Sequence, residues 1–182
     1  MAVVVAPRMA LPADIPEILR LGEYMYASVG GAVDDGWRAL GRSQLESRLG
    51  SDLLGWVIDD EAAPGQLAAC GFVNKTPRLP LPGARTALRG YVQWVVTDPT
   101  HQRQGHARAI MARLMHWAWV DGVAVLDLHS SPVARAFYAS LGFRPSPDVD
   151  YPPEVRGVPM QWRVTPTEVG PARPSGHVGD DA

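Results

Sequence analysis

The stretch Leu88-Arg89-Gly90-Tyr91-Val92-Gln93-Trp94-Val95-Val96-Thr97 decides the fold, together with the segment from 104 to 120 that follows it. Strand alternation over the first stretch places one set of side chains on one face and a second set on the other. The first set is Tyr91, Gln93, Val95 and Thr97, and the second is Val92, Trp94 and Val96. The later segment lacks proline, and its apolar residues recur at helical spacing. The sequence therefore predicts a central strand that leads through a short polar loop into a long helix.

The residues before this stretch predict two helices and a hairpin. Proline and glycine residues mark the turns between them, and apolar residues at helical or alternating spacing mark the elements. The first helix should begin at Asp14, with Glu17 completing a capping box. The expected elements are a β-branched run at 3–5, helices at 14–30 and 35–49, strands at 54–59 and 67–74, and a proline-rich loop at 75–87.

After the long helix, the sequence predicts a strand, a short helix and a closing strand. The first strand covers 123–128, and Ser131-Pro132 should open the helix with a capping hydroxyl. Gly142 should end that helix as a left-handed cap, with Phe143 packing back on the last turn. The closing strand is expected at 157–164.

This order of elements predicts the α/β (α+β) class, with a mixed, mostly antiparallel central sheet flanked by helices. We expect residues 1–165 to form a single domain. Residues 166–182 contain three prolines and three glycines and almost no large apolar residue, which predicts a disordered tail.

Composition and charge exclude several classes of function. The net charge of −2 over 182 residues provides no general positive field for nucleic acid or an anionic membrane. A helix-turn-helix surface around Arg108 and Arg113 is disfavoured for the same reason. Cys70 is the only cysteine, and His101 and His106 lack partners at metal-ligand spacing, so no metal site is expected. Without a signal peptide pattern or a long apolar run, we expect a cytoplasmic protein.

The loop and helix start from Arg103 to Arg108 favour an anion site. A helix that begins near Gln104 leaves its first N–H groups without helical partners and turns the positive end of its dipole outward. Gly105 and Ala107 have small or absent side chains, so a bulky diphosphate can approach the backbone. No P-loop or three-glycine dinucleotide pattern is present. These residues alone leave open either a pyrophosphate site or an ordinary strand-to-helix crossover.

Two motifs resemble those of a known family. Gln102-Arg103-Gln104-Gly105-His106-Ala107 resembles the Gln/Arg-x-x-Gly-x-Gly/Ala signature of the GCN5-related N-acetyltransferase (GNAT) family. Ala136-Phe137-Tyr138-Ala139-Ser140-Leu141-Gly142-Phe143 resembles the Phe/Leu-Tyr-x-x-Leu-Gly-Phe segment of the same family, and one strand separates the two motifs. The resemblance is specific over residues 91–144. It implies a GNAT-like fold and an N-acetyltransferase that uses acetyl-CoA as its co-substrate.

The resemblance also assigns the coenzyme contacts. The strand edge should pair with the pantetheine arm as an added strand would, and an N–H near Val95 or Val96 should polarise the thioester carbonyl. A bulge and a splay between this strand and the one at 123–128 should open a slot for the thioester. The implied edge residues are Val95, Val96 and Thr97, and the pyrophosphate residues are Arg103, Gln104, Gly105, His106, Ala107 and Arg108.

Two side chains are candidates for proton transfer. The family position of Tyr138 faces the coenzyme sulfur, and a phenol can donate a proton to a thiolate. His129 is a candidate relay for the proton of the amine. Glu23, Asp148 and Asp150 are further alternatives.

Two positions depart from the family pattern, and the acceptor stays unidentified beyond a primary amine. Ser131 stands where many members carry an asparagine that contacts the coenzyme, and Gln93 stands where some members place a glutamate base. Because Gln93 cannot take a proton, a non-catalytic acyl-CoA-binding sensor is the alternative function. Tyr24, Tyr26 and Trp37 are candidates to line an acceptor groove, and equally to fill a contact between helices. The resemblance makes a homodimer reasonable.

Overall fold

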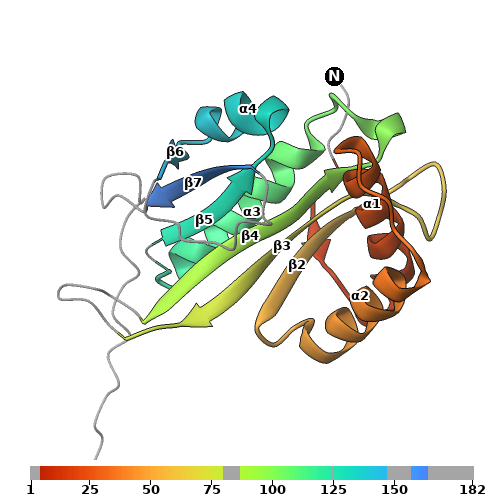
Figure 1. Ribbon diagram of the computed structural model, residues 1–182, viewed down its shortest axis with the longest axis horizontal. Helices are drawn as coiled ribbons and strands as arrows, with labels where there is room; N and C mark the ends of the chain where they lie inside the picture. Colours follow the sequence, from red (N-terminus) through yellow and green to blue (C-terminus); the bar gives the residue numbers. More distant parts are fainter. Residues whose placement is uncertain (1–4, 80–86, 124, 147–156, 164–182) are drawn as a thin grey trace, which may run out of the picture.

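The computed structural model describes residues 5–79, 87–123, 125–146 and 157–163, and a twisted sheet forms its centre (Figure 1). Within this part of the chain the sheet has seven strands in the order β1-β2-β3-β4-β5-β7-β6. The elements are β1 (Arg8–Met9), α1 (Ile15–Ser28), α2 (Asp35–Arg48), β2 (Leu53–Asp59), β3 (Leu67–Pro77), β4 (Leu88–Thr97), α3 (His106–Val120), β5 (Val125–Ser130), α4 (Arg135–Ser140), β6 (Arg144–Pro145) and β7 (Val158–Arg163). Short 3-10 turns at Pro12–Asp14, Pro99–His101 and Pro132–Ala134 precede α1, α3 and α4.

The strand directions confirm the predicted class. β4 and β5 pair in parallel, and the other neighbouring strands of the described sheet pair antiparallel. The helices cover both faces of this sheet, as the order of elements predicts for an α/β (α+β) fold.

Two apolar cores lie on opposite faces of the sheet. α1 and α2 cover one face with buried residues such as Ile18, Leu21 and Leu45. α3 covers the other face with residues such as Ile110 and Leu114, and its stripe was the clearest helical pattern in the sequence. Burial of these side chains on both faces is the main favourable contribution to the stability of the layers.

Several predicted boundaries are wrong, each for a local reason. α3 begins at His106 instead of near Gln104, because Arg103 and Gly105 adopt positive φ angles of 65° and 90° that no helix accommodates. β3 continues through Lys75 to Pro77, within the predicted loop, because these residues pair with the first residues of β4. β5 starts two residues later than expected and runs beyond Leu128 to Ser130.

The helix ends show which capping signals the fold uses. The Asp14 side chain makes no capping hydrogen bond to α1 and instead accepts one from the Leu11 amide at 2.7 Å, so the predicted capping box with Glu17 is wrong. The Ser131 hydroxyl makes no capping hydrogen bond. Gly142 has a φ of 91°, and the Phe143 amide donates to the Tyr138 carbonyl at 3.1 Å, which confirms the predicted end of α4. β1 forms at Arg8–Met9; residues 3 and 4 of the predicted run, and the tail at 166–182, lie outside the described residues.

Candidate functional site

A bulge interrupts β4 next to its C-terminal end. Gln93 and Val96 pair with residues of β3 that are two positions apart, so Trp94 and Val95 together face Gly71 alone. Trp94 takes a positive φ of 50° to accommodate the extra residue. A β-carbon at Gly71 would lie 2.4 Å from a methyl group of Ile110, so only glycine fits between the bulge and α3.

The bulge overturns the predicted alternation of β4. Val92 and Val95 both pack in the core beneath α3, whereas Trp94 and Val96 pack in the core beneath α1 and α2. The strict alternation places Val95 opposite Val92 and is therefore wrong from Trp94 onward. The bulge turns Trp94 toward the face that carries α1 and α2.

β4 and β5 separate at the same level. Their ladder consists of Gly90 opposite Leu126 and Tyr91 opposite Asp127, whereas β5 continues to pair with β7 as far as Ser130. The C-terminal end of β4 therefore diverges from its parallel neighbour. This geometry agrees with the bulge and splay that the family resemblance implies.

A cavity of about 380 Å³ lies at this divergence. Five of the predicted site residues line it together, although they come from β4, β5 and α4: Val95, Val96, Thr97, His129 and Tyr138. Tyr24 and Tyr26 of α1 form part of another wall, and Ser131 lies at the start of the segment that leads to α4. The predicted strand edge and the two proton-transfer candidates thus share one cavity.

The predicted pyrophosphate residues lie beyond the cavity wall. Among the described residues that line the cavity, Gln102 is the last before α3. Residues 103–105 connect it to α3, and residues 106–108 belong to the first turn of that helix. Gly105 caps α3 in a left-handed conformation. The amides from Gly105 to Arg108 are those that an α-helix leaves without helical acceptors. Arg108 itself reaches α4, where its guanidinium donates to the Ser140 hydroxyl at 2.9 Å.

His106 is the first residue of α3 and turns its side chain inward. It is buried, and its Nδ1 atom has no hydrogen-bond partner within the described part of the chain. Burial, followed by the nearby His101, lowers the pKa of His106 below its ordinary value. The imidazole is therefore enclosed by the protein, while the backbone amide of His106 belongs to the first turn of α3.

Tyr138 reaches the cavity from α4 although it is buried. Its side chain is 9% exposed and packs against Phe143, yet it still lines the cavity. Burial raises the pKa of Tyr138 to about 12, and nearby Tyr91 contributes in the same direction. The phenol therefore carries its proton at neutral pH.

His129 faces the same cavity from β5. Its Nδ1 atom lies 3.2 Å from the hydroxyl of Tyr91, on the adjacent strand. Burial lowers the pKa of His129, although the carboxylate of Asp127 opposes that effect. A lowered pKa keeps the imidazole neutral at pH 7, where it can accept a proton. The contact with Tyr91 depends on the offset between two parallel strands, and no motif in the sequence indicates it.

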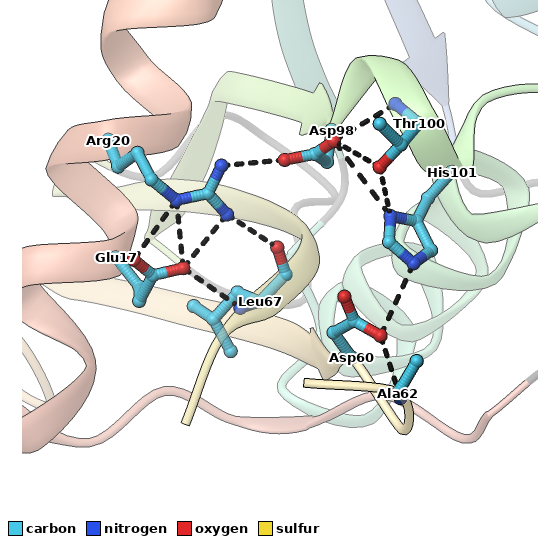
Figure 2. A network of polar contacts seen from close by, with 8 residues as sticks. All are labelled: Glu17, Arg20, Asp60, Ala62, Leu67, Asp98, Thr100 and His101. Carbon is cyan, nitrogen blue, oxygen red and sulfur yellow. Dashed lines mark hydrogen bonds and ion pairs between the residues drawn. The ribbon is translucent and has the colours of Figure 1, made fainter. Parts of the chain in front are cut away.

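A polar network fixes the segment between β4 and α3 (Figure 2). The Asp98 carboxylate accepts hydrogen bonds from Arg20 of α1 at 2.6 Å and from the hydroxyl and amide of Thr100. Burial alone would raise the pKa of Asp98, but the hydrogen bonds from Thr100 and Arg20 outweigh burial and bring it to about 2. Arg20 also pairs with Glu17 and donates to the Leu67 carbonyl at 3.0 Å. The network joins α1, β3 and the approach to α3.

The remaining sequence candidates are less suited to chemistry. Glu23 pairs with Arg38 at 2.6 Å, and this hydrogen bond lowers the pKa of Glu23. Asp148 and Asp150 lie outside the described residues. Cys70 is fully buried, and burial raises the pKa of its thiol to about 12, so it lies in the core as expected.

The described residues contain no group of three or more histidine, cysteine, aspartate or glutamate residues that could hold a metal ion. None of the helices in this part of the chain is both long and apolar enough to span a membrane.

Tyr26, Trp37 and Trp94 form an aromatic cluster between α1, α2 and the bulge. The Trp37 and Trp94 rings stack at 5.6 Å with an interplanar angle of 15°, and Tyr26 meets both edge-on. Tyr24 and Tyr26 line the cavity between β4 and β5, and Trp37 lines a second cavity under α2. Tyr26 and Trp37 therefore fill the contact between helices, and each also lines a cavity, while the acceptor groove stays a prediction.

Comparisons with known proteins agree with this geometry. Residues 51–145 match the family model described as an acetyltransferase (GNAT) domain. A "GCN5-related N-acetyltransferase 1, chloroplastic" from Arabidopsis thaliana is 41% identical over 54 residues, which are 30% of this chain. The match spans only 27% of the length of that curated relative.

Solved structures share the fold. A predicted acetyltransferase with acetyl-CoA from Clostridium acetobutylicum superposes with a TM-score of 0.71 at 19% identity, covering 80% of this chain and 94% of that one. A GCN5-related N-acetyltransferase from Ralstonia eutropha JMP134 gives a TM-score of 0.66 at 23% identity, covering 80% and 96%. The family model matches more than half of the chain, so this protein belongs to the GNAT acetyltransferase domain family, an acyltransferase family, as its two motifs predicted.

Proposed function

We propose that the chain is an N-acetyltransferase that moves the acetyl group of acetyl-CoA directly to a primary amine in a ternary complex. The observation that carries the proposal is the cavity at the divergence of β4 and β5. One wall is the bulged end of β4, and another holds the neutral His129 and the protonated Tyr138. An acyl donor and a pair of proton-transfer groups can meet there.

The residues present fit the coenzyme. The first turn of α3 offers amides and the positive end of a helix dipole to a diphosphate, and Gly105 has no side chain to obstruct it. Val95, Val96 and Thr97 lie on a strand end that has left its parallel neighbour, so its edge can pair with an extended amide chain. We assign the pyrophosphate to residues 103–108 and the pantetheine arm to this edge.

His129 and Tyr138, the two proposed proton-transfer groups, have complementary protonation states at neutral pH. A free amine with a pKa of ~10 is only about 0.1% neutral at pH 7, and this neutral form attacks after its ammonium proton has gone to solvent. A base that takes the proton released on attack then promotes the reaction. We assign that role to His129, which takes a proton as the amine nitrogen forms its bond to the carbonyl carbon. Tyr138 then donates its proton to the sulfur as the carbon–sulfur bond breaks. A backbone N–H near Val95 or Val96 stabilises the oxyanion between these steps.

Three further expectations stay predictions. We place residues 1–165 in one domain, because the described strands belong to a single sheet and the family match lies within that range. A cytoplasmic location and a homodimer rest on the sequence and on the family resemblance alone.

Calorimetry with acetyl-CoA and an assay of thiol release with a panel of amines test the proposal. The panel comprises alkylamines, arylalkylamines, polyamines, amino acids, aminoglycosides and short peptides. We expect saturable coenzyme binding and thiol release that depends on at least one amine. Failure to bind acetyl-CoA would contradict the proposal. Tight binding without turnover on any amine would favour the sensor, which the glutamine at position 93 keeps as the alternative.

A further inference from the structure

A second cavity, of about 230 Å³, lies on the other side of the bulge beneath α2. Most of its wall is apolar and comes from α2 and from β2, β3 and β4. The apolar lining consists of Trp37, Leu40, Leu45, Leu53, Phe72 and Trp94. Its volume is below the ~300–1,000 Å³ of a pocket for a whole drug-sized ligand, so it suits one ring or one branched group.

The two cavities share a wall at the bulge. Gln93 and Trp94 line both of them. A molecule whose apolar group lies beneath α2 would therefore contact the same two residues that border the coenzyme slot. An amine attached to that group by a short linker would lie beside the bulge, where the acetyl group is to be transferred.

The polar lining of this second cavity does not suit a cation. It consists of two neutral amides, Gln44 and Gln93, and of Arg48. The Arg48 guanidinium is held at 2.7 Å by Asp52 and at 3.0 Å by Asn74. Since the described lining includes no carboxylate, a second ammonium group would be buried there without a partner, which is costly.

The aromatic wall favours a flat group. Trp37 and Trp94 are stacked, and Tyr26 holds both from the side, so the two indoles are fixed before any ligand binds. A preformed wall loses little conformational freedom on binding. Aromatic rings pack on such a wall in offset or edge-on arrangements.

We propose that the cavity beneath α2 selects the acceptor, and that the acceptor is a primary amine carrying an uncharged aromatic ring on a short linker. The inference rests on the proposed acetyl transfer and names its substrate class. Polyamines and aminoglycosides, which carry several charges, are poor acceptors under this proposal.

Steady-state thiol release at saturating acetyl-CoA tests the preference, with 2-phenylethylamine, ethylamine and spermidine as probes. We expect kcat/KM for 2-phenylethylamine to exceed that for ethylamine by roughly tenfold to a hundredfold, as burial of a ring in an apolar pocket predicts. Spermidine should be no better than ethylamine.

Two variants on α2 test whether this cavity causes the preference for the aromatic amine. Leu40 lines the cavity yet is 64% exposed, so Leu40→Asp should fold while placing a carboxylate at the wall. It should lower kcat/KM for 2-phenylethylamine about tenfold, so that the preference for this amine over ethylamine shrinks by about the same factor. The matched control is Ala39→Asp, an exposed neighbour on the same helix that does not line the cavity. It should leave both amines unchanged.

Direct binding separates this inference from the proposed function. Calorimetric titration of 2-phenylethylamine into the protein saturated with CoA should give binding that Leu40→Asp weakens about tenfold and Ala39→Asp does not. Ethylamine or spermidine used as well as 2-phenylethylamine would overturn the inference while acetyl transfer stands. Absence of thiol release with every amine would refute acetyl transfer. Absence of 2-phenylethylamine binding would overturn the inference whether or not transfer occurs.

Discussion

The two ends of β4 differ in how many neighbouring strands they pair with. Up to Tyr91 the strand pairs with β3 on one side and β5 on the other, and Arg89 forms an ion pair with the buried Asp127. From Trp94 onward it is bulged, diverges from β5 and lines the cavity. Within ten residues, one strand therefore has an end that is paired on both sides and an end that has left its parallel neighbour. The cavity thus arises from the divergence of a neighbouring strand, without an added loop.

The anchored end should respond to mutation through stability. Asp127→Ala removes the carboxylate that pairs with Arg89, and loss of one partner of a buried ion pair costs about 3–5 kcal/mol. For a protein of this size we expect the Tm to fall by roughly 10 °C in a calorimetric scan. Asp121→Ala, at an exposed position after α3, is the control and should change Tm by less than about 2 °C. Equal melting of both variants would mean that the ion pair does not anchor β4.

The diverging end of β4 leads through a short turn to the proposed coenzyme site at the start of α3. Mutation there should change the affinity for the coenzyme. Gly105→Glu places a side chain and a negative charge where α3 presents its amides, and we expect the Kd for CoA to rise by about a hundredfold or more. Gly65→Glu is a matched control, because Gly65 has a φ of 89° and Gly105 one of 90°. Both variants place a glutamate at a positive φ, so the difference between them in calorimetric titration reports the effect at the helix entrance. Similar losses in the two variants would remove the helix entrance from the coenzyme site.

Sequence reasoning succeeded where the signal is local. Strand β4 has the predicted ends, because Asp98-Pro99 stops it. The end of α4 at Gly142 follows from a backbone conformation that glycine favours, and the stripe of α3 follows from its helical period. Each of these features depends on residues within one or two turns of one another.

Sequence reasoning failed where the cause lies in another strand or helix. The bulge at Trp94 depends on Gly71 of β3, so the alternation of β4 does not indicate it, and only the family resemblance implied a bulge. The contact of Tyr91 with His129 depends on the offset of two parallel strands. The cavity beneath α2 joins Leu40 to residues of three strands, and α2 by itself is a largely polar helix.

Mutation of Tyr138, the proposed proton donor, tests whether the cavity between β4 and β5 is catalytic. Tyr138→Phe removes one hydroxyl and keeps the buried ring, so we expect kcat to fall about a hundredfold, at the lower end of the ~10²–10⁴ range for general acid catalysis. The Kd for CoA should stay within about twofold, because the hydroxyl acts mainly in the transition state. Tyr24→Phe, in another wall of the cavity, is the control and should keep full turnover. Unchanged kcat in Tyr138→Phe would remove this residue from the mechanism.

The smallest effect is expected at His129. This residue contacts Tyr91, the last residue of β4 that pairs with β5. The pKa of His129 is lowered from an ordinary value near ~6.5, so the imidazole is neutral above that lowered pKa and loses its function as a base below it. His129→Gln cannot accept a proton, but water can partly replace it, so we expect kcat to fall only about tenfold at pH 7.

The ratio of wild-type to variant kcat, measured from pH 5 to 8, isolates this group because ionisation of the acceptor amine affects both enzymes equally. The ratio should be near one at the acid end and rise to its plateau as His129 loses its proton. His116→Gln, at an exposed position on α3, should give a ratio of one throughout. A flat ratio for His129→Gln would assign the proton of the amine to solvent, and it would leave the Tyr91 contact as part of the anchor of β4.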